Sequence, residues 1–136
     1  MPRIASIDIA RADAGVQATL AGVKTKIGMV PNLLSTFAQS PAVLSGCLAL
    51  SDALGKGVLT AKQREIVSLA VAQANDCHYC LSAPTLLGKG AGLSPEGIRK
   101  AREGKAEKAL DDAVARFARH GVDARSGQVS DADGHK

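Results

Sequence analysis

The chain has 136 residues, of which 46% are hydrophobic and 22% are charged, and its formal net charge is +4. These values exclude a disordered chain and fit one globular domain with a buried core. Aromatic residues make up only 2% of the chain. Because β-sheets favour aromatic and β-branched residues, this composition favours an all-α fold.

The sequence disfavours two classes of partner. No apolar run approaches the ~20 residues that a membrane-spanning helix needs, and residues 1–8 lack the basic and then apolar pattern of a signal peptide. We therefore expect a cytoplasmic protein with no membrane partner. The most basic stretch, residues 99–108, also contains Glu103 and Glu107 and is typical of a solvated helix face. We accordingly expect no nucleic-acid partner.

Start and stop signals predict three helices in the first part of the chain. A helix is expected over residues 8–26, with Asp8 as its cap, and a short one over residues 33–39. Ser40 followed by Pro41 predicts the start of a third helix that ends near Gly55. We expect one face of the first and of the third helix to be core, namely Val16, Leu20, Val23 and Ile27, and Val43, Cys47, Leu50 and Leu54.

The next two helices are predicted to form a tight pair. Thr60 and Gln63 have the spacing of a capping box for a helix over residues 60–74. Apolar residues cover most of the circumference of this helix, so we expect it to be central. A turn at residues 75–76 leads to a fifth helix over residues 77–87. A turn this short predicts that the two helices run antiparallel.

The last predicted helices lie over residues 95–104 and 106–120. We expect the final helix to turn three residues inward, Leu110, Val114 and Phe117. After Gly121 the sequence is polar, although residues 130–131 have the pattern of a helix start. We therefore divide the chain into a helical domain over residues 1–121 and a polar tail over residues 122–136.

Cys77 and Cys80 form a C-x-x-C motif at the expected start of the fifth helix. A zinc site usually needs four ligands, and no second cysteine pair is present. Covalent haem needs histidine directly after the second cysteine, where this chain has Leu81. Two buried cysteines that act as small apolar residues remain an alternative. We favour redox chemistry, because cysteines at i and i+3 can form a disulfide and a helix N-terminus stabilises a thiolate.

Glu65 is the candidate proton acceptor for such a thiolate. Measured back from the turn at residues 75–76, Glu65 and position 84 are expected at similar depth on the two antiparallel helices. Position 84 is one turn after Cys80 on the same face. A proton path from Cys80 through position 84 to Glu65 is therefore an interpretation, and an exposed acid near a helix start is the alternative.

The segments that contain these residues resemble a known family. Residues 65–71, which lead to Cys77-His78-Tyr79-Cys80, are similar to the AhpD-like, carboxymuconolactone decarboxylase superfamily, and most of all to its alkylhydroperoxidase (peroxidase-related) branch. Residues 30–33, 40–42 and 59–60 are similar to the same branch. The resemblance implies an AhpD-like helical bundle and a homo-oligomer, a trimer or a hexamer.

The resemblance also implies the chemistry of the site. Cys80 would attack a peroxide, Cys77 would resolve the product as a disulfide, and Glu65 would serve the proton relay. His78 and Tyr79 are secondary candidates because they lie between the cysteines. Neither a metal nor another cofactor is implied. The expected partners are a small-molecule peroxide and a dithiol protein that donates electrons. The implied function is a thiol-dependent peroxidase or disulfide reductase in antioxidant defence.

The chain departs from the family pattern in two places. The relay histidine is normally four residues after the second cysteine, and this chain has Pro84 there. We expect a kink near residues 82–84 and an impaired relay. The family usually continues beyond residue 131, so the resemblance implies that part of its C-terminal helices is lacking here. Apolar surface would then be uncovered around Leu69, Val114 and Phe117.

Two other functions remain open from the sequence. A decarboxylase of the same superfamily, acting on a small lactone acid, would not depend on a cysteine pair. A catalytically impaired protein that only forms oligomers would agree with Pro84. Cys47 is expected to be core rather than functional.

Overall fold

α-Helices and one short 3-10 turn make up the regular structure of residues 3–124, the part of the chain that the computed structural model describes. The all-α class predicted from the composition is confirmed. The chain divides into two compact units, Met1–Lys56 and Gly57–Lys136. The last described helix continues to Asp123, so the first residues of the expected tail over residues 122–136 are helical. Residues 125–136, with the expected helix start at residues 130–131, lie outside the described residues.

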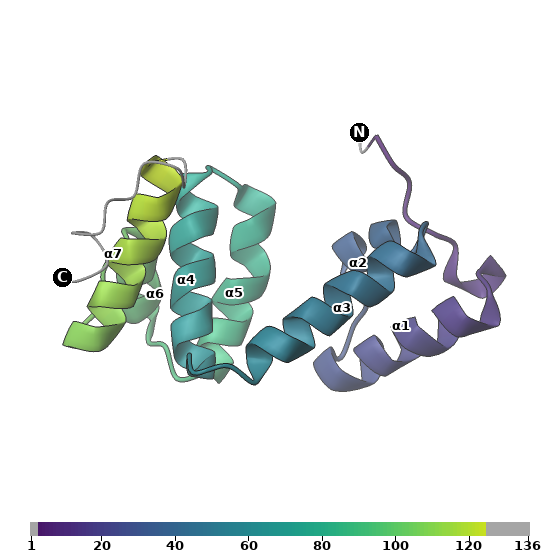
Figure 1. Ribbon diagram of the computed structural model, residues 1–136, viewed down its shortest axis with the longest axis horizontal. Coiled ribbons are helices and arrows are strands. Elements are labelled where there is room, and N and C mark those ends of the chain that lie inside the picture. Colours follow the sequence, from purple (N-terminus) through teal and green to yellow (C-terminus); the bar gives the residue numbers. More distant parts are fainter. Residues whose placement is uncertain (1–2, 125–136) are drawn as a thin grey trace. The chain divides into compact units, whose positions relative to one another are not determined.

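The first unit contains a short 3-10 turn, η1 (Ile9–Arg11), and three helices, α1 (Ala14–Ile27), α2 (Asn32–Phe37) and α3 (Pro41–Gly55) (Figure 1). The predicted helix over residues 8–26 is thus divided, because the Asp8 carboxylate accepts the N–H of Ala10 and caps η1 instead of α1. The core of this unit is formed by Val16, Leu20, Ala38 and Leu44.

The second unit contains α4 (Ala61–Ala74), α5 (His78–Gly90), α6 (Pro95–Arg102) and α7 (Ala109–Asp123). α4 contacts each of the other three helices and lies between α5 and α7 (Figure 1). Its central position is therefore confirmed. The core comprises residues from all four helices and the α5–α6 loop, namely Ile66, Leu69, Ala72, Leu81, Leu93, Ile98, Ala101 and Ala115.

The capping box that begins α4 is present as predicted. Thr60 Oγ1 accepts the N–H of Gln63 at 3.2 Å, and Gln63 Oε1 accepts the N–H of Thr60 at 3.0 Å. The side-chain amide of Gln63 also donates to Asp111 Oδ1 at 2.9 Å. Because Asp111 is in the first turn of α7, Gln63 joins the starts of α4 and α7.

The predicted inward face of α7 is wrong. Leu110 and Phe117 are 68% and 53% exposed, and Val114 is half-buried, whereas Asp111 and Ala115 are buried. The hydrogen bond from Gln63 turns Asp111 toward α4, and this rotates the apolar positions outward. Phe117 is uncovered as expected, but Leu69 is fully buried, so the expected exposure around Leu69 is also wrong.

The predicted core face of α3 is wrong as well, because that helix packs through a different face. Leu44 is buried and Leu48 partly buried. The residues expected inside are half-buried or exposed, namely Val43, Cys47, Leu50 and Leu54. In α1 the prediction holds for three residues of four, since only Ile27 is exposed.

Candidate functional site

A tight turn between α4 and α5 sets the position of the cysteine pair. The N–H groups of Asn75 and Asp76 donate to Val71 O and Gln73 O, each at 3.1 Å, and the Cys77 N–H donates to Ala72 O at 2.9 Å. Asp76 adopts φ 51°, in the left-handed region that Asp tolerates better than most residues. These bonds reverse the chain within three residues and place Cys77 at the start of α5.

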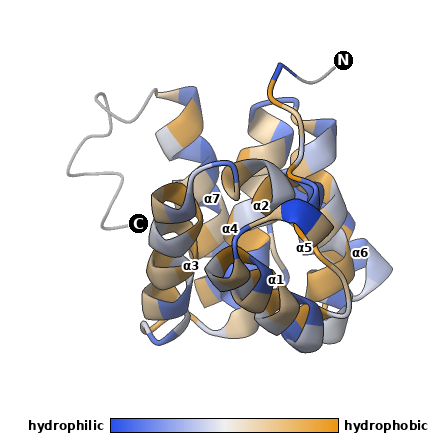
Figure 2. Cartoon of the chain, turned by 90° about the vertical axis from the view of Figure 1, so that its right-hand side faces the viewer, coloured by the Kyte–Doolittle hydropathy of each residue, from blue (hydrophilic) through white to orange (hydrophobic). Residues whose placement is uncertain are grey.

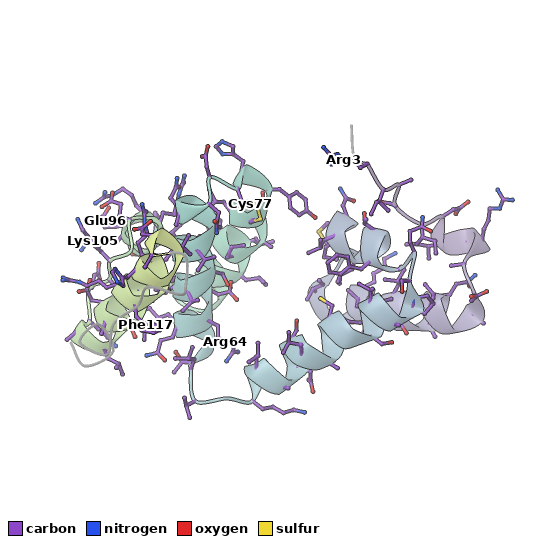
Figure 3. All side chains as sticks on the ribbon, turned by 45° about the horizontal axis from the view of Figure 1, so that its top comes forward. Arg3, Arg64, Cys77, Glu96, Lys105 and Phe117 are labelled. Atoms are coloured by element: carbon purple, nitrogen blue, oxygen red, sulfur yellow. A yellow bond between two sulfur atoms is a disulfide. The ribbon has the colours of Figure 1, made fainter. Side chains whose placement is uncertain are left out.

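Cys77 is the N-cap of α5, and its sulfur takes the part that a serine oxygen usually plays. The Cys80 N–H donates to Cys77 Sγ at 3.2 Å. The two sulfurs are joined in a disulfide, with the Cα atoms 5.2 Å apart (Figure 3). Both cysteines therefore lie in the first turn, where free N–H groups and the positive end of the helix dipole favour a thiolate.

The two cysteines of the pair differ in solvent exposure. Cys80 is exposed, whereas Cys77 is half-buried beneath the turn. An incoming reagent thus has more access to Cys80, and Cys77 lies within bonding distance behind it. This arrangement can carry a nucleophile and a resolving thiol. Cys47, the third cysteine, is not disulfide-bonded and is half-buried in the first unit.

His78 and Tyr79 lie on the outside of the first turn of α5. His78 Nε2 is 3.8 Å from Asp76 Oδ1, and both side chains are more than 80% exposed, so solvent screens their interaction. Tyr79 is 54% exposed. Both secondary candidates are therefore adjacent to the cysteines, on the surface of the unit.

Glu65 lies in the contact between α4 and α5 and is half-buried. Burial raises the pKa of its carboxyl above the usual range, and the nearby Arg64 guanidinium partly opposes that increase. Within residues 3–124 no hydrogen bond or salt bridge to its carboxylate is formed. A carboxyl in this environment binds a proton more readily than an exposed one.

Glu65, on α4, lies beside a later part of α5 than the sequence predicts. A Cβ atom built on Gly88 would lie 3.7 Å from Glu65 Cβ, so Glu65 faces Gly88. Gly88 is two turns beyond Cys80, or ~12 Å at 1.5 Å per residue. Sequence reasoning missed Gly88 as part of the site. The glycine-rich end of α5 was the available signal, since a residue without a side chain permits close helix contact.

Pro84 is buried on the face of α5 that packs against α4, together with Leu81 and Gly88. Position 84 therefore faces α4, as the interpretation of a proton path requires. α5 continues through Pro84 to Gly90, so the expected kink does not end the helix. Proline has no N–H, so the Cys80 carbonyl has no i+4 backbone donor. The pyrrolidine ring cannot relay a proton between Cys80 and Glu65.

A partly open hollow in the second unit lies away from the cysteine pair. A hollow of about 120 Å³ is lined by residues near the starts of α4, α6 and α7, among them Lys62, Ser94 and Asp111. Cys77 follows the opposite end of α4. Chemistry at the cysteine pair would therefore take place on the surface of the unit rather than in this cavity.

Comparison with known proteins identifies the family. The sequence profile of the carboxymuconolactone decarboxylase family matches residues 41–122, which include α3 to α6, nearly all of α7 and all three cysteines. The chain belongs to this family. The resemblance seen in the sequence is confirmed.

Solved structures of similar fold agree with this assignment. A peroxidase-related protein from Ralstonia eutropha JMP134, described as an alkylhydroperoxidase AhpD core, superposes with a TM-score of 0.84 at 27% sequence identity. The match covers 99% of this chain and 74% of that one. A peroxidase-related protein from Silicibacter sp. TM1040 has a TM-score of 0.81 at 23% identity, over 98% and 74% of the two chains, and supports the fold.

Two further findings concern curated relatives and membrane-spanning helices. A search of curated proteins finds no match. Within the described residues 3–124, every helix is too short or too polar to cross a lipid bilayer.

Proposed function

We propose that the chain is a thiol-dependent peroxidase or disulfide reductase that acts through Cys77 and Cys80. The observation that supports this proposal most strongly is the disulfide in the first turn of α5, with Cys80 exposed and Cys77 capping the helix. Family membership and the peroxidase-related neighbours agree with it. The substrate class is an organic hydroperoxide or hydrogen peroxide, and electrons return from a dithiol protein.

The proposed reaction begins with the Cys80 thiolate. It attacks the terminal oxygen of the hydroperoxide, the O–O bond breaks, and the alkoxide takes a proton and leaves as the alcohol. Cys80 is then a sulfenic acid. The Cys77 thiol attacks that sulfur and expels hydroxide, which leaves as water once protonated, and the disulfide forms. A dithiol donor reduces the disulfide by thiol–disulfide exchange and is itself oxidised to a disulfide.

Glu65 is proposed as the acceptor of the proton that Cys80 gives up. Its raised pKa brings the carboxyl closer to the pKa of a thiol, which favours exchange of a proton between them. The distance along α5 and the Pro84 ring mean that water must connect the two groups. The relay is therefore slower than one that passes through a histidine side chain.

A catalytically impaired protein that forms oligomers is the second candidate, and the burial of Pro84 at the relay position favours it. In that case the thiols react with peroxide no faster than free cysteine. The family description also includes lactone decarboxylation. The cysteine pair argues against that activity here, because such a reaction does not need a disulfide-forming thiol pair. A homo-oligomer, a trimer or a hexamer, remains part of the proposal.

Peroxide consumption with dithiothreitol as electron donor tests the proposal. We expect Cys80→Ser to abolish turnover. We expect Cys77→Ser, freed of dithiothreitol before hydroperoxide is added, to stop at the sulfenic acid, which a dimedone probe would label. Cys47→Ser is the matched control and should leave the rate unchanged, because Cys47 lies in the other unit. Equal rates for Cys80→Ser and the wild type would reject the proposal. Turnover of a lactone acid that survives alkylation of both cysteines would support the decarboxylase instead.

A further inference from the structure

One face of α3 carries apolar residues that its own unit does not cover. We call Val43, Cys47, Leu50 and Leu54 the α3 seam. Val43 is 48% exposed, Leu50 is 62% exposed, Leu54 is 61% exposed, and Cys47 is half-buried. Apolar residues extend over most of α3 (Figure 2). Exposed apolar residues aligned in this way are typical of an interaction surface.

The α3 seam is separate from the face through which α3 packs in its own unit. Leu44 is 1% exposed and Leu48 is half-buried against the same core. At 100° per residue, the seam is centred about 110° around the helix from Leu44 and Leu48. The core of the first unit and the seam therefore use different sides of the helix.

The spacing of the seam fits a second helix of the same sequence. Successive seam residues are separated by four, three and four positions, the pattern of a two-helix coiled-coil seam. This pattern reads the same in both directions. In an antiparallel pair centred between Leu48 and Ala49, Val43 faces Leu54 of the partner subunit, and Cys47 faces Leu50 of the partner subunit. Every seam residue then meets another seam residue.

The charges of α3 permit this antiparallel pairing. No charged residue occurs from Pro41 to Ser51. Asp52 and Lys56 pair with each other at 2.7 Å, and both lie on the opposite side of the helix from the seam. Pairing therefore brings no like charges together and desolvates no ion. Antiparallel helices also place opposite dipole ends beside each other.

We propose that the α3 seam is a two-fold interface between two copies of this chain, with the two α3 helices antiparallel. Gly46 and Ser51 flank the seam, and their small side chains allow the helices to approach closely. The interface is isologous, so each copy contributes the same surface and the contact closes on itself. This inference does not depend on the redox chemistry. Of the two assemblies proposed above, a hexamer can contain a two-fold contact, whereas an isolated trimer cannot.

Disulfide trapping tests the register. In a Cys77→Ser/Cys80→Ser background, a copy that keeps Cys47 is mixed with a copy that carries Cys47→Ser and Leu50→Cys, so the two thiols cannot bond within one chain. The thiol introduced at position 50 should bond to Cys47 of the partner subunit and give a dimer with no free thiols. Ser45→Cys is the matched control, because position 45 lies on α3 outside the seam, and it should not give this fully oxidised dimer. A parallel pair would instead link Cys47 to Cys47 of the partner subunit without any added cysteine, and this result would overturn the antiparallel register.

The mass in solution tests the surface itself. We expect light scattering to show an assembly for the wild type and a lower mass for Leu50→Glu, with Ser45→Glu unchanged and helical content retained in all three by circular dichroism. A monomeric wild type would overturn the proposal. So would a Leu50→Glu protein that keeps the wild-type mass. If that variant keeps its mass but loses helical content, residues of the same chain cover the seam, which also overturns the proposal.

Discussion

In the proposed mechanism, Pro84 is the residue that most limits the chemistry of Cys80. It lies one turn after Cys80 and is buried against α4, between the proposed nucleophile and the proposed acceptor Glu65. Proline supplies neither a proton donor nor an acceptor at its ring. The site therefore combines an accessible disulfide with a proton path that its own side chains do not complete.

Replacing Pro84 with histidine should restore the relay. We expect Pro84→His to increase the rate of Cys80 oxidation by hydroperoxide by ~100-fold, because a positioned general base typically contributes at least that much. Stopped-flow measurement of thiol loss checks the rate. Pro84→Ala is the control, since it restores the backbone N–H without a titratable group. Equal rates for the two variants would show that the backbone, and not proton transfer, is limiting.

Glu65 should make the free energy of unfolding depend on pH. Burial raises the pKa of Glu65 in the folded state above the usual 4.5. Over a range of pH above 4.5, the Glu65 carboxyl is therefore protonated in the folded state and ionised in the unfolded state. Stability contributed by the protonated form is therefore present below pH 4.5 and is lost as pH rises through the folded pKa. We expect Glu65→Gln to raise the Tm at pH 7 and to have little effect at pH 4. An equal shift in Tm at both values would contradict this assignment.

Among the elements, the contact of α5 with α4 and the α5–α6 loop depends on Gly88. A Cβ atom at this position would lie 3.0 Å from Leu93 Cδ1 and 3.7 Å from Glu65 Cβ. Because Leu93 is buried, we expect Gly88→Ala to destabilise the fold by about 1–3 kcal/mol, as overpacking usually does. Urea unfolding measures the change.

Gly90 in the same helix provides the matched control for Gly88. A Cβ atom at Gly90 would meet nothing within 4 Å. Gly90→Ala should therefore be neutral or stabilising by up to about 1 kcal/mol, because alanine has the higher helix propensity. A similar loss of stability in both variants would show that backbone conformation, and not helix contact, requires these glycines.

The starts of α4 and α7 are joined through Asp111. This carboxylate is 7% exposed, accepts a hydrogen bond from Gln63 and lies 3.8 Å from Lys62 Nζ. We expect Asp111→Ala to cost about 1–3 kcal/mol of unfolding free energy, since it leaves the buried Gln63 amide without an acceptor. Asp123→Ala, which removes an exposed pair with Arg119, should cost about 1 kcal/mol or less. Equal losses would contradict a special role for Asp111.

Local signals allowed many elements to be predicted from the sequence. The capping box at Thr60 and Gln63, the Ser40-Pro41 helix start and the turn at residues 75–76 depend on neighbouring residues alone, and the structure contains all three features. The inward faces of α3 and α7 could not be predicted in the same way. Their orientation depends on long-range packing and on the Gln63–Asp111 bond, which joins positions 48 residues apart.

The same distinction applies to the candidate site. Spacing alone brought Cys77 and Cys80 together, and the disulfide agrees with that interpretation. The position of Glu65 depends on how closely α4 and α5 approach, which is set by Gly88 and was not visible in the helical periodicity. The burial of Pro84 likewise follows from packing against α4.

In the whole molecule, one small unit carries the disulfide of Cys77 and Cys80, and the other carries the α3 seam. The second unit packs its helices around α4, so the disulfide begins a helix that is anchored in a core. The proposed chemistry needs only this unit, whereas the proposed assembly uses a helix of the first. Variants of the α3 seam and variants of the cysteines should therefore have separable effects.

The most direct test of the redox proposal is a stoichiometric oxidation. The protein is reduced, freed of reductant and mixed with one equivalent of an organic hydroperoxide, and free thiols and intact mass are recorded. We predict that the count falls from three thiols to one within seconds and that the mass falls by about 2 Da, the two hydrogens lost on disulfide formation. Slow, independent oxidation of all three thiols would contradict a working Cys77–Cys80 pair.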